Sequence, residues 1–308
     1  MKKVLFFAVI LLSFAGCKTS KVAQEIGSGS QEVWQTMLVK QLNSQVEDDV
    51  IKVKYSNGTT LYYTILDNFG HVALTWDRDG RTSFDDGKSK YKGQIEIPSF
   101  VTSGDHDEFV FQVIQIDENA FYGCNQITSV SIPYSVGIIR NAFKDCTSLK
   151  EVKVSPNNVS YTDEDGVLFS KDKKMLVIYP VKKSGTEYEL PHEVSFVCPE
   201  AFKGNENLVK VTMGNDVTAI SDYAFTNCTK LQEIRLGRSV RIIGVDAFKN
   251  CPSLAYIYSP NIFPPHNCPT VFDASTKETC KVTVPRGQKW NYSRHLEWNE
   301  FKNVSEEW

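Results

Sequence analysis

The sequence predicts a solenoid, an elongated stack of short coils, and three observations lead to this fold class. The pattern Ala-Phe-x-x-Cys-x-x-Leu-x-x-Val-x-Val recurs, with variations, in five copies, at Ala120-Phe121, Ala142-Phe143, Ala201-Phe202, Ala224-Phe225 and Ala247-Phe248. Three intervals between copies are 22, 23 and 23 residues, and the remaining interval of 59 equals one period of 23 plus an insertion of 36. The apolar share of 41% and the aromatic share of 12% are sufficient for a continuous core. Such a period is typical of proteins in which each unit buries its apolar side against its neighbours.

Each repeat is expected to contribute one short strand and one turn. In Leu-x-x-Val-x-Val the first, fourth and sixth positions are apolar, as in residues 149–154 and 231–236. We therefore expect these side chains to face the core and the third and fifth positions to face solvent. Ala-Phe and its flanking residues are expected to form one helical turn. Stacking of the coils would then place the five phenylalanines in a single interior row.

The cysteines follow the same repeat. Four of them stand three residues after the phenylalanine, and the third copy has asparagine there, which gives the set Cys124, Cys146, Asn205, Cys228 and Cys251. Because both residue types can bond to nearby backbone from a tight interior turn, this exchange predicts a buried structural ladder and argues against metal binding or catalysis. Seven cysteines lie beyond Cys17, an odd number, so a complete disulfide framework within one chain is impossible. Whether Cys268 and Cys280 pair is left open.

The amino terminus has the pattern of an export signal. Residues 1–3 are positively charged, residues 4–12 are apolar but too few to span a bilayer, and small residues follow. Phe14-Ala15-Gly16-Cys17 resembles the lipobox of bacterial lipoproteins. The resemblance implies a signal peptide over 1–16, lipidation of Cys17, a flexible tether up to residue 30, and a lipid-anchored protein of the cell envelope, in the outer membrane. An ordinary secretory signal is the alternative, and surface exposure is left open.

Both ends of the solenoid are expected to carry caps. Residues 31–112 are interpreted as an α+β amino-terminal cap, with a helix over 31–44, strands over 51–55, 60–66 and 71–76, and a hairpin turn at Asn57-Gly58. The repeats occupy 113–258, interrupted by a hairpin insertion at about 156–191. Residues 259–308 are interpreted as a carboxy-terminal cap with a short strand and an aromatic-packed helix.

These motifs resemble one known family. The repeat, the Ile132-Pro133 that follows its strand, the Asp165-Gly166-Val-Leu-Phe segment and the Val-Pro…Tyr…Trp…Phe ending are similar to the BspA-type leucine-rich repeats of bacterial surface proteins, over about residues 93–308. The resemblance implies a right-handed leucine-rich-repeat solenoid, display on the cell surface, and a role in adhesion or protein recognition. Ligands differ among members, so none is carried over.

Composition and motifs argue against several classes of chemistry. A net charge of −3 and a pI near 6.0 give no footprint for nucleic acid. The five histidines, at 71, 106, 192, 266 and 295, lack metal-ligand spacing, and we expect neither metal nor cofactor. The sequence has no nucleophile elbow, His-Glu-x-x-His motif or phosphate loop, so an enzyme is not expected. The acidic turns at 77–80 and 163–166 are interpreted as turns preceding strands, not calcium loops.

The outward strand positions are the candidate contact residues. They change from serines through mixed charges to paired tyrosines, and residue types that anchor interfaces are concentrated at Lys210, Arg235, Tyr256 and Tyr258. The alternative is that the tyrosines pack on the carboxy-terminal cap. We therefore predict a recognition or adhesion protein that binds a protein or glycan partner through its solenoid face. The alternative function is a scaffold or glycan-binding accessory component of an envelope complex, in which Trp76, Trp290 and Trp298 stack on sugars instead of packing in caps.

Overall fold

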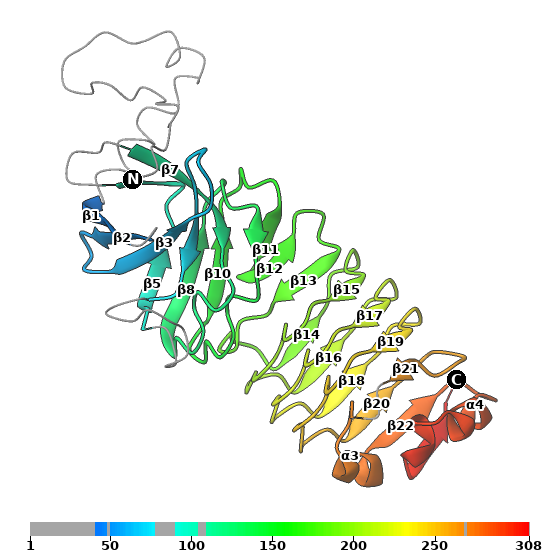
Figure 1. The fold of residues 1–308 in the computed structure, drawn as a ribbon. Helices are drawn as coiled ribbons and strands as arrows, with labels where there is room; N and C mark the ends of the chain where they lie inside the picture. Colours follow the sequence, from blue (N-terminus) through cyan, green and yellow to red (C-terminus); the bar gives the residue numbers. More distant parts are fainter. Residues whose placement is uncertain (1–40, 48–49, 78–89, 104–108, 268–269, 308) are drawn as a thin grey trace. The chain divides into compact units, whose positions relative to one another are not determined.

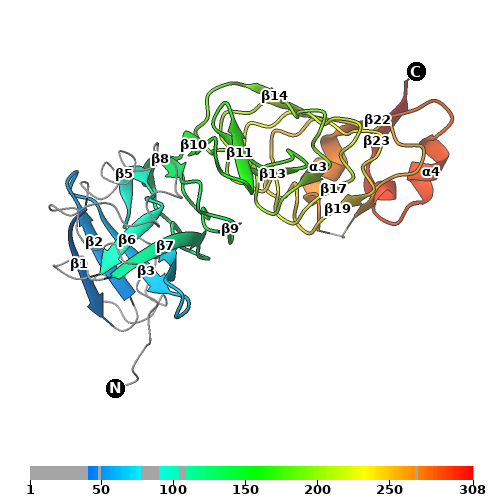
Figure 2. The ribbon, with the colours of Figure 1, turned by 90° about the horizontal axis from the view of Figure 1, so that it is seen from above.

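The computed structural model describes residues 41–47, 50–77, 90–103, 109–267 and 270–307. The chain divides into two compact units. One holds the residues up to 124 together with 132–144, and the other holds 125–131 and 145–308 (Figures 1 and 2). The expected signal peptide, Cys17, the tether and Cys268 lie outside the described residues.

The first unit is built on a seven-stranded sheet of order β1-β2-β3-β4-β7-β6, with β9 also paired to β7. Its strands are β1 (Gln41–Glu47), β2 (Val50–Tyr55), β3 (Thr60–Ile65), β4 (His71–Thr75), β6 (Phe100–Ser103), β7 (Phe109–Ile116) and β9 (Ile138–Ile139), and β5 (Lys92–Glu96) also belongs to this unit. Neighbouring strands are antiparallel except for β4–β7 and β7–β9. The strands predicted from alternation are present, and the amide N–H of Gly58, donated to the carbonyl of Tyr55, closes the β2–β3 hairpin (2.9 Å).

The helix predicted over 31–44 is wrong for residues 41–44, because these residues belong to β1 and pair antiparallel with β2. Residues 31–40 lie outside the described part. The spacing of apolar residues in 31–44 is compatible with a helix, but pairing with a neighbouring strand satisfies the backbone of its last residues instead.

The second unit is a β-solenoid whose coils contribute strands to two sheets. One sheet has the order β14-β16-β18-β20-β22-β23, and the other has the order β11-β12-β13-β15-β17-β19-β21. In the repeats the strands of the first have three residues and those of the second have two, so we call them the long-strand sheet and the short-strand sheet. The long-strand sheet consists of β14 (Glu187–Glu189), β16 (Lys210–Thr212), β18 (Glu233–Arg235), β20 (Tyr256–Tyr258), β22 (Lys281–Val284) and β23 (Asn303–Glu306). The short-strand sheet consists of β11 (Tyr161–Glu164), β12 (Val167–Ser170), β13 (Met175–Ile178), β15 (Phe196–Val197), β17 (Ala219–Ile220), β19 (Ile242–Ile243) and β21 (His266–Asn267). β10 (Glu151–Val154) pairs with β8 (Gln126–Ile132) in a further sheet.

The two sheets form because every coil repeats the same backbone geometry. Strands of the long-strand sheet are parallel, and in its regular part each residue pairs with the residue 23 positions later, as Lys210 does with Glu233 and Glu233 with Tyr256. Figure 1 shows these strands succeeding one another along the chain from β14 to β22. The 23-residue period of the sequence is therefore also the spacing along the chain between paired residues of neighbouring strands.

A row of stacked aromatic rings fills the interior of the second unit. Ring centroids lie 4.5 Å apart for Phe202 and Phe225 and 5.0 Å apart for Phe225 and Phe248, and both pairs are stacked within 12° of parallel. Two residues outside the Ala-Phe pattern extend the row. Tyr179 stacks on Phe202 at 4.9 Å, and Phe272 stacks on Phe248 at 5.3 Å. In the first unit Phe121 and Phe143 stack at 5.2 Å.

The helical turn expected at Ala-Phe is absent from the second unit, where hydrogen-bonded turns occur instead. The residue before each alanine has a positive φ, namely 58° at Glu200, 59° at Tyr223 and 52° at Asp246. A left-handed residue interrupts a right-handed helix. Alternate backbone amides are directed to the next coil: the N–H of Phe202 donates to the carbonyl of Ala224 (2.8 Å) and that of Phe225 to Ala247 (2.8 Å). The amides between them close turns within their own coil, as that of Lys203 does on the carbonyl of Glu200 (3.0 Å). Bonding between coils thus replaces bonding within a helix.

The insertion and the carboxy-terminal segment continue the coils. β11, β12 and β13 are antiparallel neighbours, and the Asp165-Gly166 turn that joins β11 to β12 has φ angles of 49° and 77°. β13 then pairs in parallel with β15. After β21 come α3 (Ala274–Thr279), α4 (Lys289–Arg294) and the 3₁₀ turn η2 (Trp298–Glu300). β22 pairs in parallel with β20, and β23 pairs in parallel with β22. The parallel stacking of strands therefore continues beyond residue 258, into the segment that the sequence predicted to be a cap.

Candidate recognition surface

The strands of the long-strand sheet present alternate side chains to the core and to solvent. The central residues of β16, β18 and β20, which are Val211, Ile234 and Ile257, are fully buried. Their neighbours form two outward rows. The first outward row is Glu187, Lys210, Glu233, Tyr256 and Lys281, and the second outward row is Glu189, Thr212, Arg235 and Tyr258. Neighbours within a row are about 4.8 Å apart along the sheet, so their side chains interact.

Lys210 connects three strands electrostatically. Its Nζ lies 3.7 Å from a carboxylate oxygen of Glu187 on β14 and 3.9 Å from one of Glu233 on β18. The lysine side chain is 32% exposed, so water screens these pairs and each contributes little to stability. These pairs fix the position of the ammonium group of Lys210, which lies between its two neighbours in the first outward row.

Arg235 is fixed more firmly by two contacts. Its Nε donates a 2.5 Å hydrogen bond to Oε1 of Glu233 in the same strand, and its guanidinium lies 4.3 Å from the ring centroid of Tyr258. Such a cation–π contact orients the planar guanidinium over the aromatic face. The remaining N–H donors of Arg235 can then meet a partner without first losing side-chain freedom.

The structure brings the four predicted contact residues onto three adjacent strands. Lys210 lies on β16, Arg235 on β18, and Tyr256 and Tyr258 on β20. Tyr256 is 46% exposed, whereas Tyr258 is partly buried beside Arg235. The second outward row ends at β22, where Thr283 is buried.

The five residues of the predicted ladder are all buried. The thiol of Cys228 donates to the carbonyl of Phe202 (Sγ–O 3.2 Å), and the thiol of Cys251 donates to that of Phe225 (3.1 Å). Asn205 bonds in both directions. Its Nδ2 donates to the carbonyl of Val181 (3.1 Å), and its Oδ1 accepts from the amides of Asn207 and Leu208 (2.9 and 2.8 Å).

Burial also determines the acidity of these thiols. It raises the pKa of Cys251 to about 12 and that of Cys228 well above the ordinary value of 9.0. Cys280 is a buried free thiol whose pKa burial raises to about 12. Because the thiolate is the reactive form, these side chains are poor nucleophiles and poor metal ligands. In the described part of the chain, no group of three or more His, Cys, Asp or Glu side chains is arranged to hold a metal ion.

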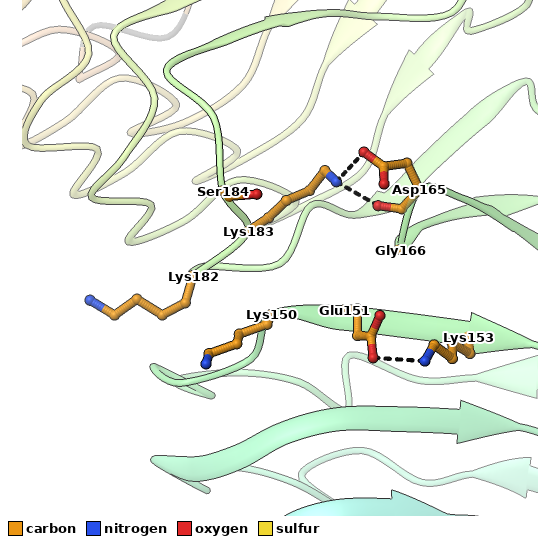
Figure 3. Close-up of a pocket in the computed structure, with 8 residues that line it drawn as sticks. All are labelled: Lys150, Glu151, Lys153, Asp165, Gly166, Lys182, Lys183 and Ser184. Carbon is orange, nitrogen blue, oxygen red and sulfur yellow. Dashed lines mark hydrogen bonds and ion pairs between the residues drawn. The ribbon is translucent and has the colours of Figure 1, made fainter.

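A polar cavity of about 420 Å³ lies beside β10, where the insertion returns to the coils (Figure 3). Its lining residues are Lys150, Glu151, Lys153, Asp165, Gly166, Lys182, Lys183 and Ser184. Three of the four lysines are ion-paired: Lys153 with Glu151 (2.9 Å), Lys183 with Asp165 (2.5 Å) and Lys182 with Glu206. Sequence reasoning missed this cavity because the insertion separates its two lysine pairs along the chain.

The three tryptophans considered for sugar stacking are in different environments. Trp298 is fully buried, with its Nε1 donating to the carbonyl of Pro265 (2.9 Å), and Trp76 is buried as well. Trp290 on α4 is 60% exposed. Only Trp290, among these three, presents a ring to solvent. No helix among the described residues has the length and apolarity required to cross a bilayer.

Comparison with known proteins agrees with this geometry. Residues 94–174 and 181–267 match the BspA type leucine rich repeat region, in six copies. A leucine-rich repeat protein from Eubacterium ventriosum is 20% identical, with a TM-score of 0.56, and the alignment covers 86% of this chain and 84% of that one. One from Bacteroides ovatus is 17% identical, with a TM-score of 0.38 and coverage of 80% and 75%. At these identities the likeness concerns the fold alone. A search of curated proteins finds no match.

Proposed function

This chain belongs to the BspA-type leucine-rich-repeat family, and on this premise we propose that it is a recognition or adhesion protein, anchored in the cell envelope, that binds a macromolecular partner through its solenoid face. Repeat proteins of this kind are generally binding scaffolds, and extended faces of stacked strands suit large partners better than small substrates. The contact patch is the part of the outward rows formed by Lys210, Arg235, Tyr256 and Tyr258.

One observation carries this proposal more than the others. The guanidinium of Arg235, bonded to Glu233 and stacked on Tyr258, lies on the strand next to that of the exposed Tyr256. Arginine and tyrosine dominate the energetics of protein interfaces, and a preorganised pair loses less entropy on binding. The partner we propose is a protein or a glycan.

A photocrosslinking amino acid at Thr212, an outward neighbour of Arg235, tests the patch on living cells. We expect a covalent adduct with a macromolecule, and we expect the variant Arg235→Ala/Tyr256→Ala/Tyr258→Ala to lose it. The same probe at Lys249, a turn position that is half-buried like Thr212, is the matched control. An adduct that persists in a folded triple variant would remove the patch from consideration.

The anchoring part of the proposal depends on Cys17. It is supported by the resemblance of residues 14–17 to a lipobox. Cells fed an alkyne-labelled fatty acid should label the wild-type chain and leave Cys17→Ala unlabelled. An unlabelled wild type would refute lipidation. Protease treatment of intact cells separates surface display from a periplasmic orientation in the outer membrane.

The exposure of Trp290 favours a second candidate function, that of a scaffold or glycan-binding accessory component of an envelope complex. A tryptophan ring that is 60% exposed can stack on a sugar. Retention on immobilised polysaccharides that Trp290→Ala abolishes would support this alternative. Unaltered passage of the wild type through a panel of such gels would dismiss it.

A further inference from the structure

A group of large apolar side chains is exposed at the carboxy-terminal end of the second unit. Ile262, Phe263, Trp290 and Leu296 are 59%, 73%, 60% and 85% exposed. We call these four residues the apolar end patch. Single exposed apolar residues are common, but four on two adjoining segments mark an interaction site.

Hydrogen bonds hold the two segments of this patch together. Nδ2 of Asn291 donates to the carbonyl of Ile262 (3.0 Å), and the hydroxyl of Tyr292 donates to that of Asn261 (3.1 Å). Farther along, Nε1 of Trp298 donates to the carbonyl of Pro265. Residues 261–265 therefore run alongside residues 291–298. The tip at Ile262 and Phe263 is fixed on both sides while its side chains remain exposed.

Basic residues accompany the patch. Arg286, Lys289 and Arg294 are exposed, and no ion pair found in the described part of the chain involves any of them. The guanidinium of Arg294 lies over the Trp290 ring, 4.2 Å from its centroid. Four carboxylates belong to the same region. Those of Glu300 and Glu307 are ion-paired with Lys277 and Lys281, and the other two are Glu297 and Glu306, which accepts the amide N–H of Lys289 (2.7 Å). The local balance remains positive.

We propose that the apolar end patch and its basic rim dock onto an anionic lipid surface. Tryptophan, phenylalanine and aliphatic side chains beside arginine and lysine are the composition of segments that lie in the membrane interface, where indole rings reside at headgroup depth. The three cations attract acidic headgroups, and the four apolar side chains enter the acyl boundary. None of these residues belongs to the outward rows, and the patch would bring the second unit to a membrane independently of the predicted anchor.

Vesicle co-sedimentation tests the proposal with the chain from residue 18 on, which keeps every described residue and lacks the predicted leader. We expect binding to phosphatidylcholine vesicles that contain about 30% phosphatidylglycerol, weak binding to pure phosphatidylcholine, and a blue shift of tryptophan emission that Trp290→Phe abolishes. Phe263→Ser/Trp290→Ser should weaken partitioning about tenfold or more. Arg286→Gln/Lys289→Gln/Arg294→Gln should remove the preference for anionic lipid.

A matched control removes exposed apolar side chains elsewhere in the same unit. Val159→Ser/Ile242→Ser changes residues that are 81% and 55% exposed and should leave vesicle binding unchanged. Three results would overturn the proposal: no binding of the wild type to anionic vesicles, equal losses in control and patch variants, or a dimer in light scattering that Phe263→Ser/Trp290→Ser dissociates. The last would assign the patch to a second copy of the chain.

Discussion

The inward and outward sides of the same strands differ in how strictly they repeat. On the inward side of β16, β18 and β20 stand Val211, Ile234 and Ile257, all aliphatic and fully buried. On the outward side the first row changes from Lys210 to Glu233 to Tyr256. Each inward side chain must pack against the equivalent side chain of the next coil, whereas the outward side chains meet only solvent or a partner. This contrast separates the residues that determine the fold from those available for recognition.

The largest expected effect comes from breaking the interior row. Phe225 is fully buried between Phe202 and Phe248, so Phe225→Ala leaves a cavity with stacked rings on both sides. We expect a loss of about 3–5 kcal/mol in the free energy of unfolding, measured by urea denaturation. A loss below about 1 kcal/mol would mean that the coils do not depend on the row.

A methyl group placed between two coils should have the next largest effect. A Cβ at Gly237 would lie 2.0 Å from the carbonyl oxygen of Gly214, which precedes it by one 23-residue period. Gly237→Ala therefore forces the backbones apart and should cost about 1–3 kcal/mol. Gly204→Ala is informative beside it, because a Cβ there meets no atom within 4 Å and only the positive φ of 73° opposes it. Equal melting temperatures for the two variants would contradict the close contact.

Asn205 tests whether the ladder positions are equivalent. Asn205→Ala leaves the buried amide of Leu208 and the part-buried amide of Asn207 without their acceptor and should cost about 1–3 kcal/mol. Asn205→Cys should cost less, because a thiol can donate to the preceding coil as those of Cys228 and Cys251 do. If Asn205→Cys is as unstable as Asn205→Ala in urea, the two residue types are not interchangeable at this position.

Ionisation of the buried thiols should make the free energy of unfolding depend on pH. The folded pKa of Cys251, about 12, exceeds its ordinary value of 9.0, so its contribution to stability is complete below pH 9 and is lost as the pH rises from 9 towards 12. Between pH 9 and 10 each such thiol should lower the free energy of unfolding by about 1 kcal/mol. In urea titrations Cys251→Ala should show a correspondingly shallower alkaline decline. An identical decline would show that this thiol ionises freely in the folded state.

The same contrast explains what the sequence could predict. The 23-residue period predicted the stacking of coils and the inward positions, because each coil must pack against the next in the same way and therefore keeps an apolar residue at the same place. The parallel register of the strands is seen in the structure. Tyr179 and Phe272 were missed from the aromatic row, since Ile-Tyr and Val-Phe stand where the pattern has Ala-Phe. The left-handed residues at Glu200 and Asp246 carry no glycine signal, so the turns were predicted to be helical. Hydrogen bonds between coils determine the conformation of these turns, and the helix propensity of the local sequence does not indicate such bonds.

For the recognition surface, the strand phase predicted which residues face outward but not how they are held. Nothing in the sequence indicates that Arg235 would bond to Glu233 and stack on Tyr258, because both contacts depend on side-chain conformation. The apolar end patch was also missed. Its members are scattered between residues 262 and 296, and only the folded carboxy-terminal segment brings them together.

The smallest effect is expected on the outward side of the strands, if the outward rows carry no part of the fold as we claim. We would measure the free energy of unfolding of Arg235→Ala/Tyr256→Ala/Tyr258→Ala in urea. Because these side chains are exposed or only partly buried, each substitution should change it by no more than about 0.5 kcal/mol, and the three together by no more than about 1.5 kcal/mol. A loss comparable to that of Phe225→Ala would contradict the claim and assign the outward residues to stability.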